Sequence, residues 1–291
     1  MISSNCQMGQ GSASVKISDA DFEMIRDFIY SHCGIYMNAS KKYYLENRLS
    51  RRMCATGIKS HEEYGKLLRD GVRGKEELRH LLNELTTTET RFFRIMPQLS
   101  AMENRFLPEI VEAKQKIGFR KIRVWSAGTS SGEEPYTLAM ILLEKMATIL
   151  KGWTVEVIGT DINETILAKA REGIFNGYAV RNMPEYYRKK YFLEENPERY
   201  VLSQEVKKLV TFSHLNLYDD SRMVFMKSFD FIFCANVLIY FDESSKAKVV
   251  QHFYNNLLPY GYLFVGQSES LHGVNDRFKT VHFPGGFAYR K

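Results

Sequence analysis

The sequence predicts an α/β protein with a doubly wound, mostly parallel sheet, preceded by a small all-helical domain. Three observations support this prediction. From Lys121 onward, short runs of β-branched and aromatic residues alternate with segments of helical periodicity. Between Ser18 and Leu85, apolar residues recur only at helical spacing. At 174–208 the alternation is interrupted by tyrosine-rich segments, which predict a helix and an antiparallel hairpin inserted as a small β-subdomain.

These patterns divide the chain into a flexible polar tail at 1–17, a helical domain at 18–85 and an α/β domain at 86–291, with the insertion at 174–208. Four helices are expected in the helical domain. The first ends at Gly34, because glycine readily adopts the left-handed conformation that follows a helix. The third begins with a capping box formed by Ser60 and Glu63. The second and fourth are expected at 40–56 and 75–85.

In the α/β domain, the expected strands are short apolar runs, and several helices follow a polar residue that can cap them. The expected strands are 122–126, 155–160, 209–213, 229–234 and 262–266. The expected helices are 133–150, 164–171 and 244–258. One hairpin is expected near Tyr200–Lys207 in the insertion, and another closes the chain with 278–282 and 287–290.

The composition is that of an ordinary globular protein, with 44% hydrophobic and 25% charged residues in a chain of 291. The apolar runs are only a few residues long, so no membrane insertion is expected. The polar N-terminus lacks the apolar segment of a signal peptide. The four cysteines are scattered, without a C-x-x-C pair or a Cys/His cluster. This scatter argues against a metal site and favours a cytoplasmic protein.

The net charge of +6 is concentrated in one segment near the N-terminus. Residues 41–80 contain eleven Lys and Arg residues against six Asp and Glu residues, a net charge of +5. In the second expected helix, Lys41, Arg48 and Arg52 fall on one ridge, within roughly 40° of one another at about 100° per residue. The ridge is either a docking surface for an acidic partner or a solvated helix face.

The stretch from Ile122 to Tyr136 has the order of a strand, a loop of small residues and a helix start at Glu133-Glu134-Pro135. α/β proteins build nucleotide-binding crevices in this order. However, the loop lacks the strict G-x-G-x-x-G pattern, and two glutamates stand where a phosphate would meet the helix N-terminus. A ligand with ribose hydroxyls and a positive charge, such as S-adenosylmethionine (SAM), suits this loop better. An ordinary strand-to-helix turn is the alternative.

Polar residues also follow the ends of other expected strands, namely Asp161, Asn216 and Asn236. The carboxyl ends of parallel strands meet at one edge of the sheet, where such proteins bind ligands. Asp161 is placed to accept the ribose hydroxyls of an adenosine, unless it only marks the start of the next helix. No Pro-Pro-aromatic sequence follows Asn236, which argues against a base amine as acceptor, so no nucleic-acid partner is expected.

Five motifs, in order, resemble those of the CheR family, the chemotaxis receptor glutamate O-methyltransferases, which have a Rossmann-like SAM-dependent methyltransferase fold. They are Thr86–Arg94, Ser126–Tyr136, Thr160–Asn163, Phe233–Asp242 and Gly266–Ser270. The resemblance covers nearly the whole chain, including a basic helical N-terminal domain and an inserted β-subdomain. It implies methyl transfer from SAM to glutamate side chains of chemoreceptor cytoplasmic domains, with S-adenosylhomocysteine as the second product.

By position, the resemblance also implies the site residues. The implied SAM-binding residues are Thr88, Thr90, Arg94, Glu134, Asp161, Asn216, Leu217, Ala235 and Asn236. Arg94 would clamp the acceptor carboxylate, and Tyr240 would hydrogen-bond the same carboxylate or the cofactor. Three positions depart from the family pattern, because Thr88 replaces Asn, Asn163 replaces Asp and Ala235 replaces Arg. Thr88 keeps a hydroxyl, whereas Ala235 can offer only its backbone.

The resemblance further implies that basic residues such as Lys41, Arg48 and Arg52 dock onto the receptor methylation helices. Some family members also bind a receptor C-terminal peptide by adding it to the inserted hairpin as a strand. Two alternatives remain at this stage. A pI near 9.0 favours SAM-dependent methylation of nucleic acid. The departures at Thr88 and Ala235 favour a non-catalytic, SAM-sensing adaptor.

Overall fold

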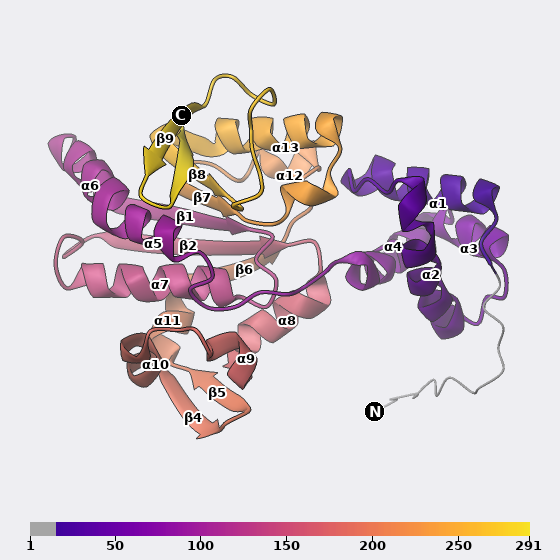
Figure 1. Ribbon diagram of the computed structural model, residues 1–291, viewed down its shortest axis with the longest axis horizontal. Coiled ribbons are helices and arrows are strands. Elements are labelled where there is room, and N and C mark those ends of the chain that lie inside the picture. The colour runs from indigo at the N-terminus through magenta and orange to yellow at the C-terminus, as the bar shows by residue number, and fades with distance from the viewer. Residues whose placement is uncertain (1–15) are drawn as a thin grey trace. The chain divides into compact units, whose positions relative to one another are not determined.

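The computed structural model describes residues 16–291, which fall into two compact units that divide between Thr87 and Thr88 (Figure 1). The expected tail at 1–17 lies outside the described residues except for Lys16 and Ile17. Ile17 is buried, and its backbone N–H donates to Glu46 Oε2 at 3.1 Å.

The first unit is all-helical, as predicted. Its helices are α1 (Asp19–Cys33), the 3-10 turn η1 (Ala39–Lys41), α2 (Lys42–Thr56), α3 (His61–Leu68) and α4 (Gly71–Leu85). Ser60 caps α3, because its hydroxyl accepts the N–H of Glu63 at 3.2 Å. The fourth helix begins at Gly71, earlier than expected, because residues 71–74 continue its helical hydrogen bonding instead of forming a separate loop.

A buried ion pair crosses the first unit and changes the interpretation of the basic ridge. Arg52 donates from Nε and Nη2 to the two carboxylate oxygens of Glu77 at 2.9 and 2.8 Å. The hydroxyl of Tyr64 donates to the same carboxylate. The Arg52 side chain is 17% exposed and that of Glu77 is 6% exposed. The charge of Arg52 is therefore neutralised inside the unit, and the ridge presents less free charge than the sequence pattern indicates.

The second unit is the predicted α/β domain, built on a seven-stranded mixed sheet. Across the sheet the strands are β6 (Val210–His214), β2 (Thr154–Asp161), β1 (Lys121–Ala127), β7 (Phe229–Cys234), β8 (Leu257–Val265), β10 (Gly286–Arg290) and β9 (Lys279–Phe283). The first five are parallel, and β10 runs antiparallel to both of its neighbours. This is the doubly wound order expected from the alternation of strands and helices.

Helices cover both faces of this sheet, and α7 and α13 lie on opposite sides of it (Figure 1). They are α5 (Met96–Ala101), the π-helical turn η2 (Met102–Phe106), α6 (Leu107–Lys116), α7 (Glu133–Met146), α8 (Glu164–Glu172), α12 (Asp220–Met223), the 3-10 turn η3 (Leu238–Tyr240) and α13 (Glu243–Asn256).

The two cores of the second unit follow the alternation of side chains along the central strands. Phe231 and Phe233 pack in one core with residues of η2 and α7. Ile232 and Cys234 pack in the other, together with Phe253 of α13. Because successive side chains of a strand point to opposite faces, β7 is buried on both sides, which explains its continuous apolar sequence.

The insertion forms a separate three-stranded antiparallel sheet, and here one prediction is wrong. The sheet has the order β3-β5-β4. Its elements are β3 (Ile174–Phe175), α9 (Gly177–Val180), α10 (Glu185–Tyr191), β4 (Phe192–Asn196), β5 (Arg199–Leu202) and α11 (Gln204–Leu209). The hairpin pairs β4 with β5, whereas Glu205–Lys207, expected to be a strand, belongs to α11. Ser203 precedes this helix in an extended conformation, so a helix N-terminus replaces the expected turn.

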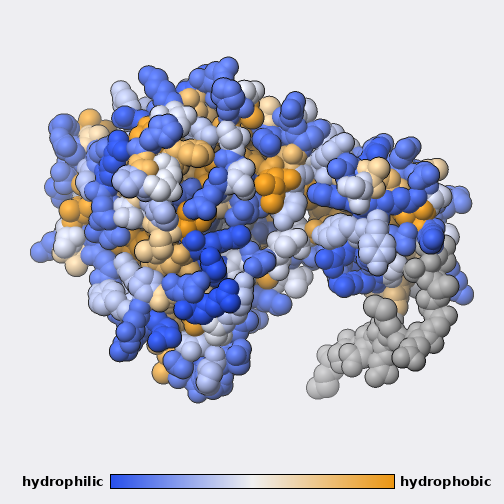
Figure 2. All heavy atoms as spheres, in the orientation of Figure 1, coloured by the Kyte–Doolittle hydropathy of each residue, from blue (hydrophilic) through white to orange (hydrophobic). Residues whose placement is uncertain are grey.

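On the face shown in Figure 2, hydrophilic residues predominate and hydrophobic ones are scattered among them. Among residues 16–291, no helix combines the length and the apolar character needed to cross a membrane.

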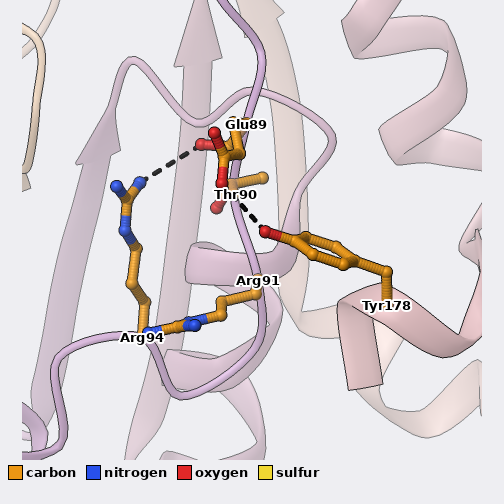
Figure 3. Close-up of a pocket in the computed structure, with 5 residues that line it drawn as sticks. All are labelled: Glu89, Thr90, Arg91, Arg94 and Tyr178. Atoms are coloured by element: carbon orange, nitrogen blue, oxygen red, sulfur yellow. Dashed lines mark hydrogen bonds between the residues drawn. The ribbon is translucent and has the colours of Figure 1, made fainter. Parts of the chain in front are cut away.

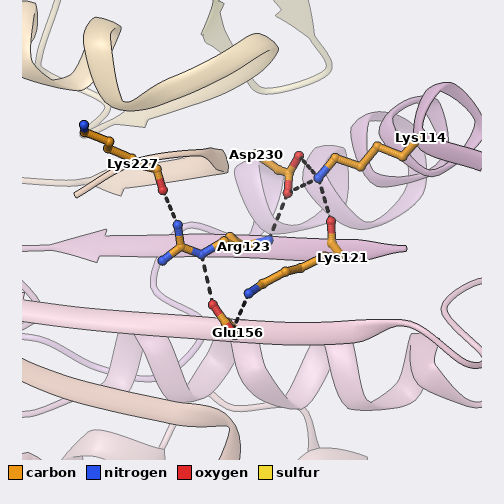
Figure 4. A network of polar contacts seen from close by, with 6 residues as sticks. All are labelled: Lys114, Lys121, Arg123, Glu156, Lys227 and Asp230. Atoms are coloured by element: carbon orange, nitrogen blue, oxygen red, sulfur yellow. Dashed lines mark hydrogen bonds and ion pairs between the residues drawn. The ribbon is translucent and has the colours of Figure 1, made fainter. Parts of the chain in front are cut away.

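A network of polar contacts joins α6, β1, β2 and β7 near the amino ends of β1 and β7 (Figure 4). Lys114 of α6 donates to Asp230 Oδ2 at 2.7 Å and to the carbonyl of Lys121 at 2.6 Å. Asp230 also accepts the backbone N–H of Arg123 at 2.9 Å. Arg123 in turn pairs with Glu156 of β2 at 2.9 Å. Burial raises the pKa of Asp230, and the charge of Lys114 opposes that rise.

Lys114→Met should strongly destabilise the α/β unit, because it leaves Asp230 buried without its cation. Loss of one partner from a buried ion pair typically costs about 3–5 kcal/mol. Lys116→Met is the matched control, because Lys116 lies on the same helix and pairs with Glu112 in solvent. Urea unfolding at pH 7 should show a large fall in midpoint for the first variant and almost none for the second. Equal midpoints would show that the network does not hold the sheet together.

Candidate functional site

The predicted residues at the strand ends lie along the carboxyl edge of the sheet. β1, β2, β6, β7 and β8 are parallel, so their last residues lie along one edge. Asp161 ends β2, and Asn216 and Asn236 follow β6 and β7 by two residues each. The N–H of Leu215 donates to the carbonyl of Asp161 at 3.0 Å, and this bond joins the end of β6 to the end of β2.

The loop from β1 to α7 packs directly against the segment that follows β7. Gly128 has a φ of +76°, and a Cβ there would lie 2.3 Å from Val237 Cγ2. Only glycine permits this approach. The small residues of the loop therefore bring the ends of β1 and β7 into contact.

Asp161 is held by backbone donors from both sides. Its Oδ2 accepts the N–H of Ser130 at 2.8 Å, and its Oδ1 accepts the N–H of Asn163 at 2.9 Å. Asn163, and not Asp161, caps α8, because its side chain accepts the N–H of Ile166. Burial raises the pKa of Asp161, and the backbone donors oppose the rise. The alternative interpretation of Asp161 as the cap of the next helix is thus excluded.

Two carboxyl groups stand at the start of α7. Ser126 Oγ donates to Glu134 Oε1 at 2.6 Å, and Ser131 Oγ donates to Glu133 Oε2 at 2.6 Å. Burial raises the pKa of Glu134 to about 7; Ser126 and the positive charge of Arg94 oppose the rise, and the charge of Glu269 adds to it. Burial likewise raises the pKa of Glu133 to about 6. This end of α7 favours a positively charged ligand over an anion.

The segment Thr88–Arg94 joins this edge to the inserted subdomain. Ser130 Oγ donates to the carbonyl of Thr88 at 2.9 Å. The N–H of Phe92 donates to the carbonyl of Ala179 at 3.1 Å, and the Phe92 ring meets the rings of Phe175 and Phe192 edge-on at 4.7 and 5.1 Å. The two phenylalanines of the segment thus lie in the core, while its polar residues face outward.

Those polar residues line an open pocket (Figure 3). The lining residues are Glu89, Thr90, Arg91, Arg94 and Tyr178. The Tyr178 hydroxyl of α9 donates to Glu89 Oε1 at 2.8 Å, and Arg94 Nη1 donates to the carbonyl of Glu89 at 3.2 Å. Two arginines and one glutamate line the pocket, and the glutamate carboxylate is already bonded to Tyr178, so the pocket has an excess of positive charge that favours an anionic ligand.

The remaining predicted residues follow the carboxyl ends of β6 and β7. Asn216 Oδ1 accepts the N–H of Tyr218 at 3.0 Å, and Leu217 is buried. Ala235 is half-buried. Tyr240 ends η3 and is half-buried, and within residues 16–291 its hydroxyl makes no hydrogen bond to the other predicted residues. The structure therefore places Tyr240 on the segment that follows β7, and within residues 16–291 no hydrogen bond joins it to Arg94.

Sequence reasoning assigned no role to Glu269, Ser130, Arg91 or Tyr178. Glu269 is buried in the turn after β8 and accepts three backbone N–H groups. It lies in the Gly266–Ser270 motif. An acidic residue shortly after the buried strand 262–266 is the signal in the sequence that could have identified it as a site residue. No comparable signal marks Tyr178, which comes from the insertion. Among residues 16–291, no group of three metal-ligating side chains converges.

Comparison with known proteins gives matches over nearly the whole chain. Residues 88–287 match the family model described as CheR methyltransferase, SAM binding domain, and residues 20–86 match CheR methyltransferase, all-alpha domain. A chemotaxis protein methyltransferase of Borreliella burgdorferi is 34% identical over 269 residues, which are 92% of this chain and 94% of that protein. Chemotaxis protein methyltransferase 2 of Vibrio cholerae is 37% identical over 277 residues, 95% of this chain and 94% of that protein.

Ser126→Ala should raise the pKa of Glu134 above about 7, because it removes a hydrogen bond that favours the ionised carboxylate. Ser131→Ala is the reciprocal control and should raise the pKa of Glu133 instead. Carboxyl-carbon NMR titration of the labelled protein would follow both groups separately. Equal titration of Glu134 in the wild type and in Ser126→Ala would contradict the assignment.

Proposed function

The chain belongs to the CheR methyltransferase family, with SAM as its methyl donor, and on this basis we propose that it methylates glutamate side chains of chemoreceptor cytoplasmic domains. The products would be a glutamate methyl ester and S-adenosylhomocysteine, and the reaction would serve chemosensory adaptation. The relatives named as chemotaxis protein methyltransferases support the receptor as the substrate class.

The carboxyl edge of the sheet fits SAM in the chemistry of its donors. Asp161 offers carboxylate oxygens to ribose hydroxyls, and Glu134 offers a negative charge to a cationic group. Ala235 contributes through its backbone only. The residues that we propose to hold SAM are Thr88, Thr90, Arg94, Glu134, Asp161, Asn216, Leu217, Ala235 and Asn236.

The pocket beside Arg94 is the main support for a carboxylate as the methyl acceptor. Two guanidinium groups, those of Arg91 and Arg94, line it, so it suits a carboxylate. The charge of Arg94 also reaches Glu134, so this anion pocket adjoins the proposed donor site. A nucleic-acid base amine would gain nothing from this arrangement.

The proposed reaction depends on the orientation of the acceptor carboxylate toward the methyl group, and it requires no proton transfer. A glutamate with a pKa near 4.3 is already ionised at pH 7, so no general base is required. SAM supplies an electrophilic methyl group on a sulfonium. Arg94 would hold the acceptor carboxylate, and Tyr240 would donate a hydrogen bond to it. One carboxylate oxygen then forms the new bond to the methyl carbon while the carbon–sulfur bond breaks and its electron pair stays on sulfur.

The deciding experiment is transfer of tritiated methyl groups to a receptor cytoplasmic fragment, with DNA and RNA as competing acceptors. Label on the fragment that mild alkali releases as methanol supports the proposal. Arg94→Ala should lower kcat/KM on the order of 100-fold, because the acceptor is no longer oriented. Arg222→Ala, an exposed arginine on α12, should leave it unchanged. Label in nucleic acid would support the rival acceptor, and S-adenosylhomocysteine binding without any transfer would support an adaptor.

We further propose that the receptor docks on the basic side of α2 and of the preceding turn η1, through Lys41 at the end of η1 and Arg48 of α2. Arg48 lies over the ring of Tyr44 at 5.0 Å, and both side chains are half-buried. Arg52 is left out of this surface because Glu77 binds it. A receptor C-terminal peptide would add to β4, which forms an edge of the small sheet.

Arg48→Glu should slow receptor methylation, and the loss should be larger at low salt because exposed charges are less screened there. Lys75→Glu, on α4, is the matched control with the same change in net charge. Methylation rates at two ionic strengths and S-adenosylhomocysteine affinity by calorimetry would be measured for both variants. Affinity should be unchanged in each. Equal rates for Arg48→Glu and Lys75→Glu would contradict docking on α2.

A further inference from the structure

Glu269 holds the segment after β7 in place. Its side chain is buried, 5% exposed, in the tight turn that follows β8. Oε2 accepts the N–H of Gly266 at 2.6 Å and that of Asn236 at 2.9 Å, and Oε1 accepts the N–H of Ile239 at 3.2 Å. One carboxylate therefore ties the ends of two neighbouring strands to η3.

The backbone that it holds is in a left-handed conformation. Asn236 has a φ of +61°, which asparagine adopts more readily than other non-glycine residues but which still turns the chain sharply after β7. The hydrogen bond from the N–H of Asn236 to Glu269 fixes this turn.

The position of this carboxylate is itself enforced by close packing. A Cβ on Gly266 would lie 2.7 Å from Glu269 Oε2 and 3.0 Å from the backbone nitrogen of Asn236. No side chain fits there, so glycine at 266 allows the carboxylate and the Asn236 amide to meet. Glu269 also lies close enough to Glu134 for its charge to act on that group, which places it beside the proposed donor site.

We propose that Glu269 is a positioning residue for methyl transfer, which sets the segment Asn236–Tyr240 by holding the N–H groups of Asn236 and Ile239. Asn236 and Tyr240 are the residues through which it acts, so the inference rests on the proposed function. Glu269 itself touches backbone amides and not the reacting atoms.

Glu269→Gln is the informative variant because it keeps the shape of the side chain. The amide can still accept through one oxygen, but its NH2 group then faces a backbone N–H, and at least one of the three bonds is lost. Ser268→Ala, at an exposed neighbour in the same turn, is the matched control. Tyr240→Phe, alone and combined with Glu269→Gln, tests whether the two residues act together.

Amide hydrogen exchange would be measured on the full-length variants. In Glu269→Gln, the amides of Asn236 and Ile239 should exchange about tenfold faster, while the amide of Val124 in β1 stays protected. Receptor methylation should show a fall in kcat with little change in the KM for receptor. Tyr240→Phe should cost much less in the Glu269→Gln background than alone, because Tyr240 is already displaced. Ser268→Ala should behave as wild type.

Each contrary result overturns the inference. Unchanged exchange at Asn236 and Ile239 would show that Glu269 does not hold the segment. Faster exchange throughout the sheet would show a general loss of stability, and additive effects of Glu269→Gln and Tyr240→Phe would show independent roles. If the wild type methylates no receptor fragment, the proposed function fails, whereas hydrogen exchange and S-adenosylhomocysteine affinity still test whether Glu269 shapes the site.

Discussion

The parallel pairing of β6, β2, β1, β7 and β8 is the constraint on which the site depends. The loops that follow parallel strands all begin at the same edge of the sheet, and in this protein several carboxyl groups lie at that edge. Glu134 lies at the start of α7 after β1, Asp161 ends β2, and Glu269 lies in the turn after β8. A buried carboxylate is costly unless donors surround it. Each of the three is therefore satisfied locally, by a serine hydroxyl or by backbone N–H groups.

Buried carboxylates are stabilised differently at the two ends of the sheet. At the amino ends, Asp230 has a cation of its own chain, Lys114, and the network is complete. At the carboxyl edge, Asp161 and Glu269 are bonded to amides, which carry no formal charge. The negative charge of this edge is thus stabilised but only partly neutralised, since Arg94 acts on it from the neighbouring pocket. Such an edge complements the positive charge of a sulfonium ligand.

The sequence allowed the fold to be predicted in most of its elements, because periodicity and turn residues are local signals. β7 was expected with its observed limits, since its short length and its aromatic and β-branched residues favour a buried strand over a buried helix. The segment Glu205–Lys207 was wrongly expected to be a strand because three residues do not distinguish a strand from a helix start. Arg52 was misread for a different reason. Its partner Glu77 lies on another helix, and helical spacing within α2 cannot reveal a contact of this kind. The predicted residues at the strand ends follow from topology, whereas the contribution of Tyr178 depends on how the insertion folds back.

The packing of Phe92 and Phe93 has a consequence for the architecture of the chain. Phe92 packs between Phe175 and Phe192, and Phe93 contacts Tyr187, so both depend on residues inside the insertion. An insertion that follows a complete βα unit is often expected to fold independently of the domain that carries it. In this protein the insertion shares its hydrophobic core with the α/β domain. Excision of 174–208 would expose two phenylalanines and release the segment that carries Arg94, so the shortened chain would lose part of the proposed site together with the insertion.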